Sequence, residues 1–171
     1  DIMDTIKPLA DQYANVKAPH FVQMVKKQLE EELGKTIVGE GGLSVKTTLD
    51  LDAQTTLETN IAKLFNGEIT DGNCGYRNCS QFAGFSNGAA AIEDTKTGQL
   101  IALVGSRDFN YAGFGQDNAA TAFIQPGSSI KPLVYARLFS NQGGNNANYG
   151  SGSILADSKT TFPGNYSPNN A

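Results

Sequence analysis

The stretch Gln125–Pro132 constrains the fold more than any other part of the sequence, because its two prolines fix φ and its Pro126-Gly127 pair favours a turn. Pro132 is tolerated only in the first turn of a helix, where its missing amide hydrogen costs no hydrogen bond. The apolar residues that follow therefore predict a helix that starts at about Ser128. Residues three apart share a helix face, so the Ser128 hydroxyl and the Lys131 amine are expected to meet.

This predicted helix start combines three groups that acyl-transfer chemistry uses. The Ser128 hydroxyl is a candidate nucleophile, and a neutral Lys131 amine could take its proton. The unpaired amide hydrogens of a first helical turn, at the positive end of the dipole, suit a developing oxyanion. A Ser-x-x-Lys pattern alone occurs by chance in many chains. The alternative is therefore a helix start with no catalytic function, in which the lysine is incidental.

Composition argues against several classes of function. The chain has 171 residues, a net charge of -4, one histidine and two cysteines. The sequence has no basic stripe, so a nucleic-acid partner is not expected. With so few histidine and cysteine side chains, a metal site is not expected either. No cofactor is implied. No apolar run is long enough for a transmembrane helix. Cys74 and Cys79 lie in a turn-rich loop, where a local disulfide, fitting an oxidising compartment, and two free thiols both remain open.

Hydrophobic periodicity and turn residues predict a mixture of helices and antiparallel strands. The single histidine, His20, stands at a helix start far in sequence from Ser128, which favours a structural role over a catalytic one. The predicted order is a lead-in or linker at residues 1–17, a helix from Pro19 that Gly34 ends, a half-buried strand at Leu43–Leu49, a helix capped by Asp50 or Asp52 and ended by Asn66-Gly67, a loop at 68–87, a hairpin of Ala89–Ile92 with Leu100–Val104, an irregular stretch at 105–124, and a mobile loop at 140–153.

Five short motifs in a fixed order resemble the transpeptidase domain of class A penicillin-binding proteins, which also carry a glycosyltransferase domain. The resemblance implies an α+β, β-lactamase/transpeptidase-like fold, an antiparallel sheet with helices packed on it, of which residues 18–171 would be only the N-terminal portion. The sequence departs from the pattern at Phe123-Ile124, where many members carry a basic residue. The motifs are Ala18–Val22, Gly41–Asp50 with Gln54, the hairpin with Asp94, Thr97-Gly98 and Gly105–Asn110, the stretch Gln125–Pro132, and Ile154–Asp157 with Asn165–Pro168.

The resemblance implies a function and a set of roles. Ser128 would attack the penultimate D-Ala of a peptidoglycan stem pentapeptide, Lys131 would take its proton, and an acceptor amine would resolve the acyl-enzyme. Gly127 and Ser129, beside the nucleophile, are assigned to substrate binding, and β-lactam antibiotics would acylate the same serine. The parent protein would be extracytoplasmic, in the cell envelope, and anchored in the cytoplasmic membrane through a segment outside this sequence.

Two motifs that the family places after the nucleophile, Ser-x-Asn and Lys-Thr-Gly, are missing from their expected positions. Lys96-Thr97-Gly98 precedes Ser128 and is predicted to be a hairpin turn. Ser167-Pro168-Asn169 contains a proline where a short helical turn is required. The sequence therefore predicts half of an active site, inactive alone, with an unpaired sheet edge and with its C-terminal portion on a second polypeptide.

Two other functions are weighed against transpeptidation. A serine hydrolase of the D,D-carboxypeptidase or β-lactamase type belongs to the same superfamily, but the motifs within residues 18–54 argue against it. A non-catalytic domain that binds muropeptides would form no covalent adduct, and intact Ser128 and Lys131 lower its odds.

Overall fold

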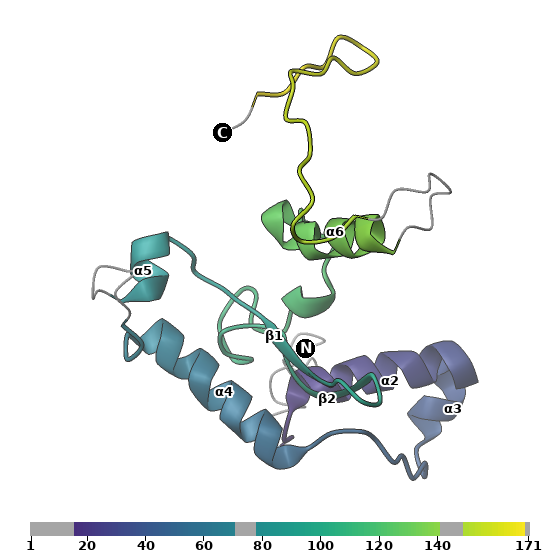
Figure 1. Ribbon diagram of the computed structural model, residues 1–171. Helices are drawn as coiled ribbons and strands as arrows, with labels where there is room; N and C mark the ends of the chain where they lie inside the picture. Colours follow the sequence, from purple (N-terminus) through teal and green to yellow (C-terminus); the bar gives the residue numbers. More distant parts are fainter. Residues whose placement is uncertain (1–15, 71–77, 141–148, 170–171) are drawn as a thin grey trace. The chain divides into compact units, whose positions relative to one another are not determined.

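The computed structural model describes residues 16–70, 78–140 and 149–169 (Figure 1). The chain divides into two compact units, residues 1–123 and residues 124–171. The lead-in predicted at 1–17 and the loop predicted at 140–153 lie mostly outside the described residues. Within the described ranges, no helix has the length and apolar character needed to cross a membrane.

Helices and one antiparallel strand pair make up the described structure, in agreement with an α+β class. The first unit contains α2 (Pro19–Leu33), α3 (Lys35–Glu40), α4 (Leu51–Asn66), α5 (Cys79–Ala83), β1 (Ala90–Asp94), β2 (Gln99–Val104) and the short 3-10 helix η3 (Ala119–Thr121). The second unit contains the 3-10 helix η4 (Gly127–Ile130) and α6 (Lys131–Phe139).

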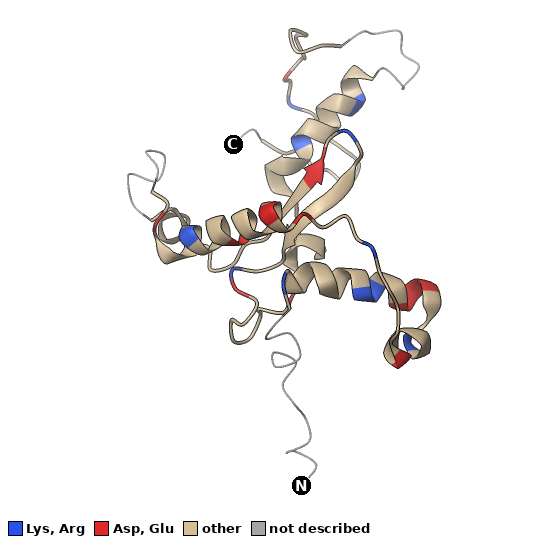
Figure 2. Cartoon of the chain, turned by 90° about the horizontal axis from the view of Figure 1, so that it is seen from below, with Lys and Arg blue, Asp and Glu red and all other residues tan. Residues whose placement is uncertain are grey.

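Helix α2 forms as predicted and supplies part of the core of the first unit. Pro19 occupies its first turn, and Gly34 ends it with a left-handed φ of 88° and an amide that donates to Glu30. The buried residues Ala18, Phe21 and Leu103 pack together, which joins the start of α2 to β2. The charged face of α2 carries both signs in i, i+4 pairs, such as Lys26 with Glu30 at 3.8 Å (Figure 2).

Helix α4 is capped by Asp50, not by the alternative Asp52. The Asp50 carboxylate accepts from the amides of Asp52 and Ala53 at 2.9 and 3.0 Å, and Gly67 with φ 81° ends the helix. Gln54 attaches α4 to β2: its Oε1 accepts from the Leu103 amide at 2.8 Å, and its Nε2 donates to the Leu103 carbonyl at 3.0 Å. One side-chain amide thus satisfies both backbone groups at this point of the sheet edge.

The predicted hairpin forms, with strand boundaries that differ from the prediction by no more than two residues. Strands β1 and β2 are antiparallel, with Ala91 opposite Leu103 and a register shift between Ile92 and Glu93. The turn is closed by the Gly98 amide donating to the Asp94 carbonyl at 2.7 Å, with Gly98 at φ 70°. Lys96-Thr97-Gly98 is therefore a hairpin turn, as predicted.

The strand predicted at Leu43–Leu49 is wrong, although the whole segment is described. It meets β2 only near its end, where Thr48 Oγ1 donates to Leu100 and the Asp50 amide donates to Ile101 at 2.9 Å. A strand needs a continuous ladder, and the preceding residues have no such partner. Alternate residues of the segment still lie on one side, because Val45, Thr47 and Leu49 line one groove along α2.

Two short helices were not predicted. Helix α3 follows Gly34 and buries none of its residues. Helix α5 lies inside the predicted loop at 68–87, where the Asn78 side chain accepts from the amide and the hydroxyl of Ser80. A side-chain cap of this kind can hold a single turn whose sequence shows no periodicity.

Candidate functional site

The predicted nucleophile turn begins with Gly127 at a left-handed φ of 53° and continues as the 3-10 turn η4. The Lys131 amide donates to the Ser128 carbonyl, which joins η4 to α6, and Pro132 stands in the first turn of α6. A helix start at about Ser128 is thus confirmed, with the difference that the first turn is 3-10 rather than α. In a 3-10 turn, side chains three residues apart eclipse one another. Ser128 and Lys131 therefore lie on the same side of this turn.

The two adjacent serines of the turn have different surroundings. Ser129 Oγ donates to the Pro126 carbonyl at 2.5 Å, and the Ser129 amide donates to the same oxygen at 3.1 Å. The Ser128 side chain is exposed and makes no side-chain hydrogen bond within the described residues, and none joins its Oγ to Lys131 Nζ. Of the two hydroxyls, only that of Ser128 is without a hydrogen bond to the described residues, whereas that of Ser129 is bonded to the Pro126 carbonyl.

Helix α6 exposes an apolar surface next to these residues. None of its residues is buried; Leu133 is 67% exposed and Val134 56% exposed. Large apolar side chains gathered on one helix normally pack against another element. Lys131 is also exposed in this unit. The turn therefore holds a hydroxyl and an amine, without a covering wall among the described residues of the second unit.

Two other sequence predictions concern residues away from the turn. Cys79 begins α5 and is not a free thiol, while Cys74, and with it the predicted pairing, lies outside the described residues. Ser167-Pro168-Asn169 follows the bridge between Phe162 and Tyr166 and forms no helical turn. Among the described residues, no cluster of three or more His, Cys, Asp or Glu side chains could hold a metal ion.

His20 lies in the first unit, buried at the start of α2, where its ring is hydrogen-bonded to the Gly115 carbonyl at 2.9 Å. This is the structural role that the sequence favoured. Its partner is far away in the chain, so no local pattern could have identified it. Gln54 was noticed only as part of a motif. Its two hydrogen bonds to the Leu103 backbone were missed because Leu103 is also far away in the chain.

Comparison with curated proteins finds several relatives. The chain is 34% identical over 131 residues to penicillin-binding protein 2D of Bacillus subtilis, covering 75% of this chain and 16% of that protein. It is 33% identical over 120 residues to penicillin-binding protein 1B of Vibrio cholerae, covering 70% and 14%. Penicillin-binding protein 1F of Bacillus subtilis is 29% identical over 155 residues, covering 88% of this chain and 18% of that protein.

The chain thus spans less than a fifth of the length of these relatives. No protein-family model matches the chain, and no solved structure matches it significantly.

Proposed function

The chain belongs to the penicillin-binding proteins, and on that premise we propose that it forms the N-terminal portion of a peptidoglycan D,D-transpeptidase domain with Ser128 as nucleophile. The observation that carries the proposal is the contrast within the turn. The Ser128 hydroxyl is exposed beside Lys131, while the neighbouring Ser129 hydroxyl is bonded to Pro126. The finer fold assignment, β-lactamase/transpeptidase-like, belongs to the same proposal.

The proposed reaction has two steps. Ser128 Oγ attacks the carbonyl of the penultimate D-Ala of a stem pentapeptide while the Lys131 amine takes the hydroxyl proton. The peptide bond then breaks, and the terminal D-Ala leaves with the proton on its new amine. In the second step an acceptor amine attacks the ester, the new peptide bond forms, and Ser128 Oγ recovers its proton.

Binding of the reacting carbonyl is assigned to the backbone around Ser128. The Ser128 amide is the candidate oxyanion donor, since it stands at the start of a helical turn. Gly127 has open space where a Cβ would stand, so a substrate main chain can approach its backbone closely. Ser129 contributes by holding the turn through its bonds to Pro126.

The opposite wall of the site is proposed to come from the C-terminal portion of the same domain. Helix α6 buries none of its residues. The backbone N–H and C=O of Leu103 bond to Gln54 and not to β1. The N–H and C=O of Ala91, which lies opposite Leu103, therefore point away from β2 to the other edge of β1, where no described strand pairs. Both surfaces are unfinished, as expected if the remaining strands, the Ser-x-Asn and the Lys-Thr-Gly motifs lie elsewhere.

The proposed partners follow from this function. They are the stem pentapeptide as substrate and β-lactam antibiotics as acylating ligands. The proposed location is the cell envelope, outside the cytoplasm, with the parent protein anchored by a segment outside this sequence.

Acylation by a fluorescent penicillin tests the proposal in the complete protein. We expect a covalent label that the substitution Ser128→Ala abolishes and that Ser158→Ala, at an exposed serine outside residues 125–132, retains. A label that survives Ser128→Ala would exclude Ser128 as the nucleophile. Absence of any label on a folded wild-type protein would favour a non-catalytic muropeptide-binding domain. Release of product with water but never with an acceptor amine would favour a hydrolase.

A further inference from the structure

A buried polar cluster in the first unit joins α2 to the loop of residues 105–119. His20 is 4% exposed, and its Nε2 lies 2.9 Å from the Gly115 carbonyl. Ser106, 1% exposed, donates to the same carbonyl at 2.6 Å, and its Oγ is 3.4 Å from the histidine Nε2. A carbonyl only accepts, so Nε2 carries a hydrogen. The second proton of a charged ring would therefore be added at Nδ1.

The loop has internal bonds that do not involve the histidine. The Ala119 amide donates to Gly105 at 2.9 Å and closes the base of the loop, and the Gly115 amide donates to Tyr111 at 2.9 Å. These hydrogen bonds can form without His20. What the ring supplies is attachment to α2.

The histidine ring fits closely between parts of the loop. Its edge-to-face contact with Phe109 has a centroid distance of 4.9 Å. At Gly105, a Cβ would lie 2.6 Å from the ring carbon Cδ2, so only glycine leaves room for the ring. Departure of the ring would therefore uncover Gly105 and its bond to Ala119.

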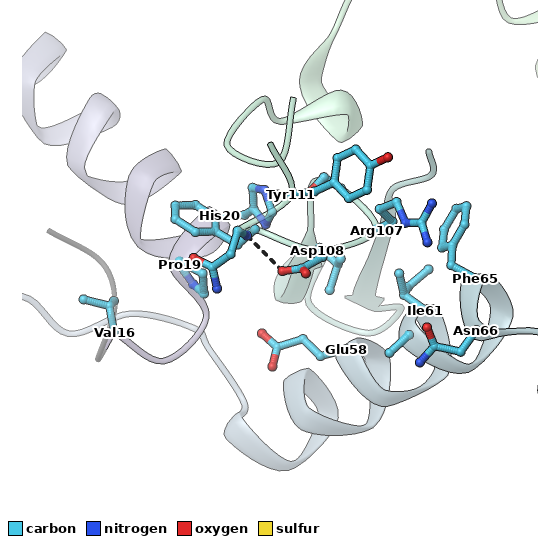
Figure 3. Close-up of a pocket in the computed structure, with 15 residues that line it drawn as sticks. Val16, Pro19, His20, Glu58, Ile61, Phe65, Asn66, Arg107, Asp108 and Tyr111 are labelled. Atoms are coloured by element: carbon cyan, nitrogen blue, oxygen red, sulfur yellow. Dashed lines mark hydrogen bonds between the residues drawn. The ribbon is translucent and has the colours of Figure 1, made fainter. Parts of the chain in front are cut away.

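On one side the ring borders a cavity of about 440 Å³, shown with its lining side chains in Figure 3. The charged groups of this cavity are Glu58 on α4 and Arg107 and Asp108 in the loop. The Arg107 guanidinium lies over the rings of Phe65 and Tyr111, at 4.8 and 5.0 Å. Among the described residues, no carboxylate is hydrogen-bonded to the histidine ring.

The electrostatic balance favours the neutral ring. Burial lowers the pKa of His20 below its ordinary value of 6.5, and the bond to Gly115 and the charge of Glu58 oppose this only in part. A protonated ring keeps its Nε2 hydrogen bond but places a charge on a side chain that is only 4% exposed. The charged form is therefore better solvated outside the cluster than inside it.

We propose that His20 is a pH-sensitive latch, which holds the 105–119 loop against α2 when neutral and releases it when protonated. The latch lies within the first unit and is independent of whether Ser128 reacts. Released, the loop loses its attachment to α2 and the ring no longer covers Gly105, so the hydrogen bond from the Ala119 amide to the Gly105 carbonyl opens more often.

Nuclear magnetic resonance of the ¹⁵N-labelled protein tests the latch. The ring nitrogens of His20, identified by their loss in His20→Gln, are followed against pH together with hydrogen exchange of the Ala119 amide. We expect the Nε2–H form at neutral pH and a ring midpoint below 6.5. Exchange corrected for its intrinsic pH dependence should accelerate through the same midpoint, about tenfold for each unit of pKa depression.

The variants separate a latch from a general loss of stability. Glutamine can still donate to Gly115 but cannot titrate, so His20→Gln should show exchange that is flat with pH. Ser106→Ala keeps the histidine and should keep the midpoint. A ring midpoint at or above 6.5, or wild-type exchange that does not follow the ring, would overturn the proposal. The wild-type titration decides the question even if His20→Gln fails to fold.

Discussion

At the scale of the residue, Gly115 is closely enclosed by backbone atoms of the first unit. A Cβ there would lie 2.5 to 2.6 Å from the backbone atoms of Phe109, Asp108 and Tyr111. These are main-chain atoms that cannot turn aside, so Gly115→Ala must displace the loop. We expect a loss of about 1–3 kcal/mol in the free energy of unfolding, measured by urea denaturation.

A matched glycine provides the control for this substitution. Gly39 has nothing within 4 Å of its Cβ position and lies in α3. Gly39→Ala should be neutral or gain up to about 1 kcal/mol, because alanine favours a helix. Equal effects at both positions would contradict the steric argument.

The single histidine gives stability a defined pH dependence. Its pKa is lower in the folded protein than in the unfolded chain, so the unfolded chain binds more protons in acid. The contribution of His20 is complete above pH 6.5 and is lost as the pH falls through the folded pKa. Urea midpoints at several pH values should show a decline below 6.5 that is smaller in His20→Gln. An identical decline in both proteins would show that His20 is not its source.

At the scale of the element, the link between α4 and β2 depends on one side chain. Removing the Gln54 amide leaves the buried Leu103 amide and carbonyl without their partner. We expect Gln54→Ala to cost about 2–4 kcal/mol in the free energy of unfolding, since each unsatisfied buried group costs about 1–3 kcal/mol. The control is Gln28→Ala, which removes only an exposed bond to Glu32 and should change stability by less than about 0.5 kcal/mol.

Elements with local signals were predictable, and those that depend on distant partners were not. Pro19 and Gly34 delimit α2, Asp50 caps α4, and the Asp94–Gly98 turn closes the hairpin, all through neighbours in sequence. The segment Leu43–Leu49 alternates like a strand, but strand formation requires a ladder that alternation cannot supply. Three of its alternating residues, Val45, Thr47 and Leu49, nevertheless line one groove along α2.

The same distinction applies to the candidate site. The turn at Gly127 and the placement of Ser128 and Lys131 on one side of it follow from the prolines and the spacing alone. The bond between Ser129 and Pro126, which distinguishes the two serines, is equally local but was not anticipated. The hydrogen bond from His20 to Gly115 joins residues far apart in the chain. No local pattern in a single sequence indicates such a contact.

At the scale of the whole molecule, the second unit should need a partner. Its apolar side chains are exposed along α6, with Leu133 67% exposed. We therefore expect the 171-residue chain alone to bind a hydrophobic dye and to remain unreactive toward penicillin. Adding the C-terminal portion of the domain should abolish dye binding and restore acylation. Acylation of the chain alone would contradict the proposal that the site is completed elsewhere.

Identification of the residue that penicillin modifies tests directly whether Ser128 is the nucleophile. The complete protein is treated with benzylpenicillin, digested, and the adduct located by mass spectrometry. We expect one penicilloyl group, attached to Ser128 and not to Ser129. An adduct on any other residue, or none on a folded protein, would contradict it.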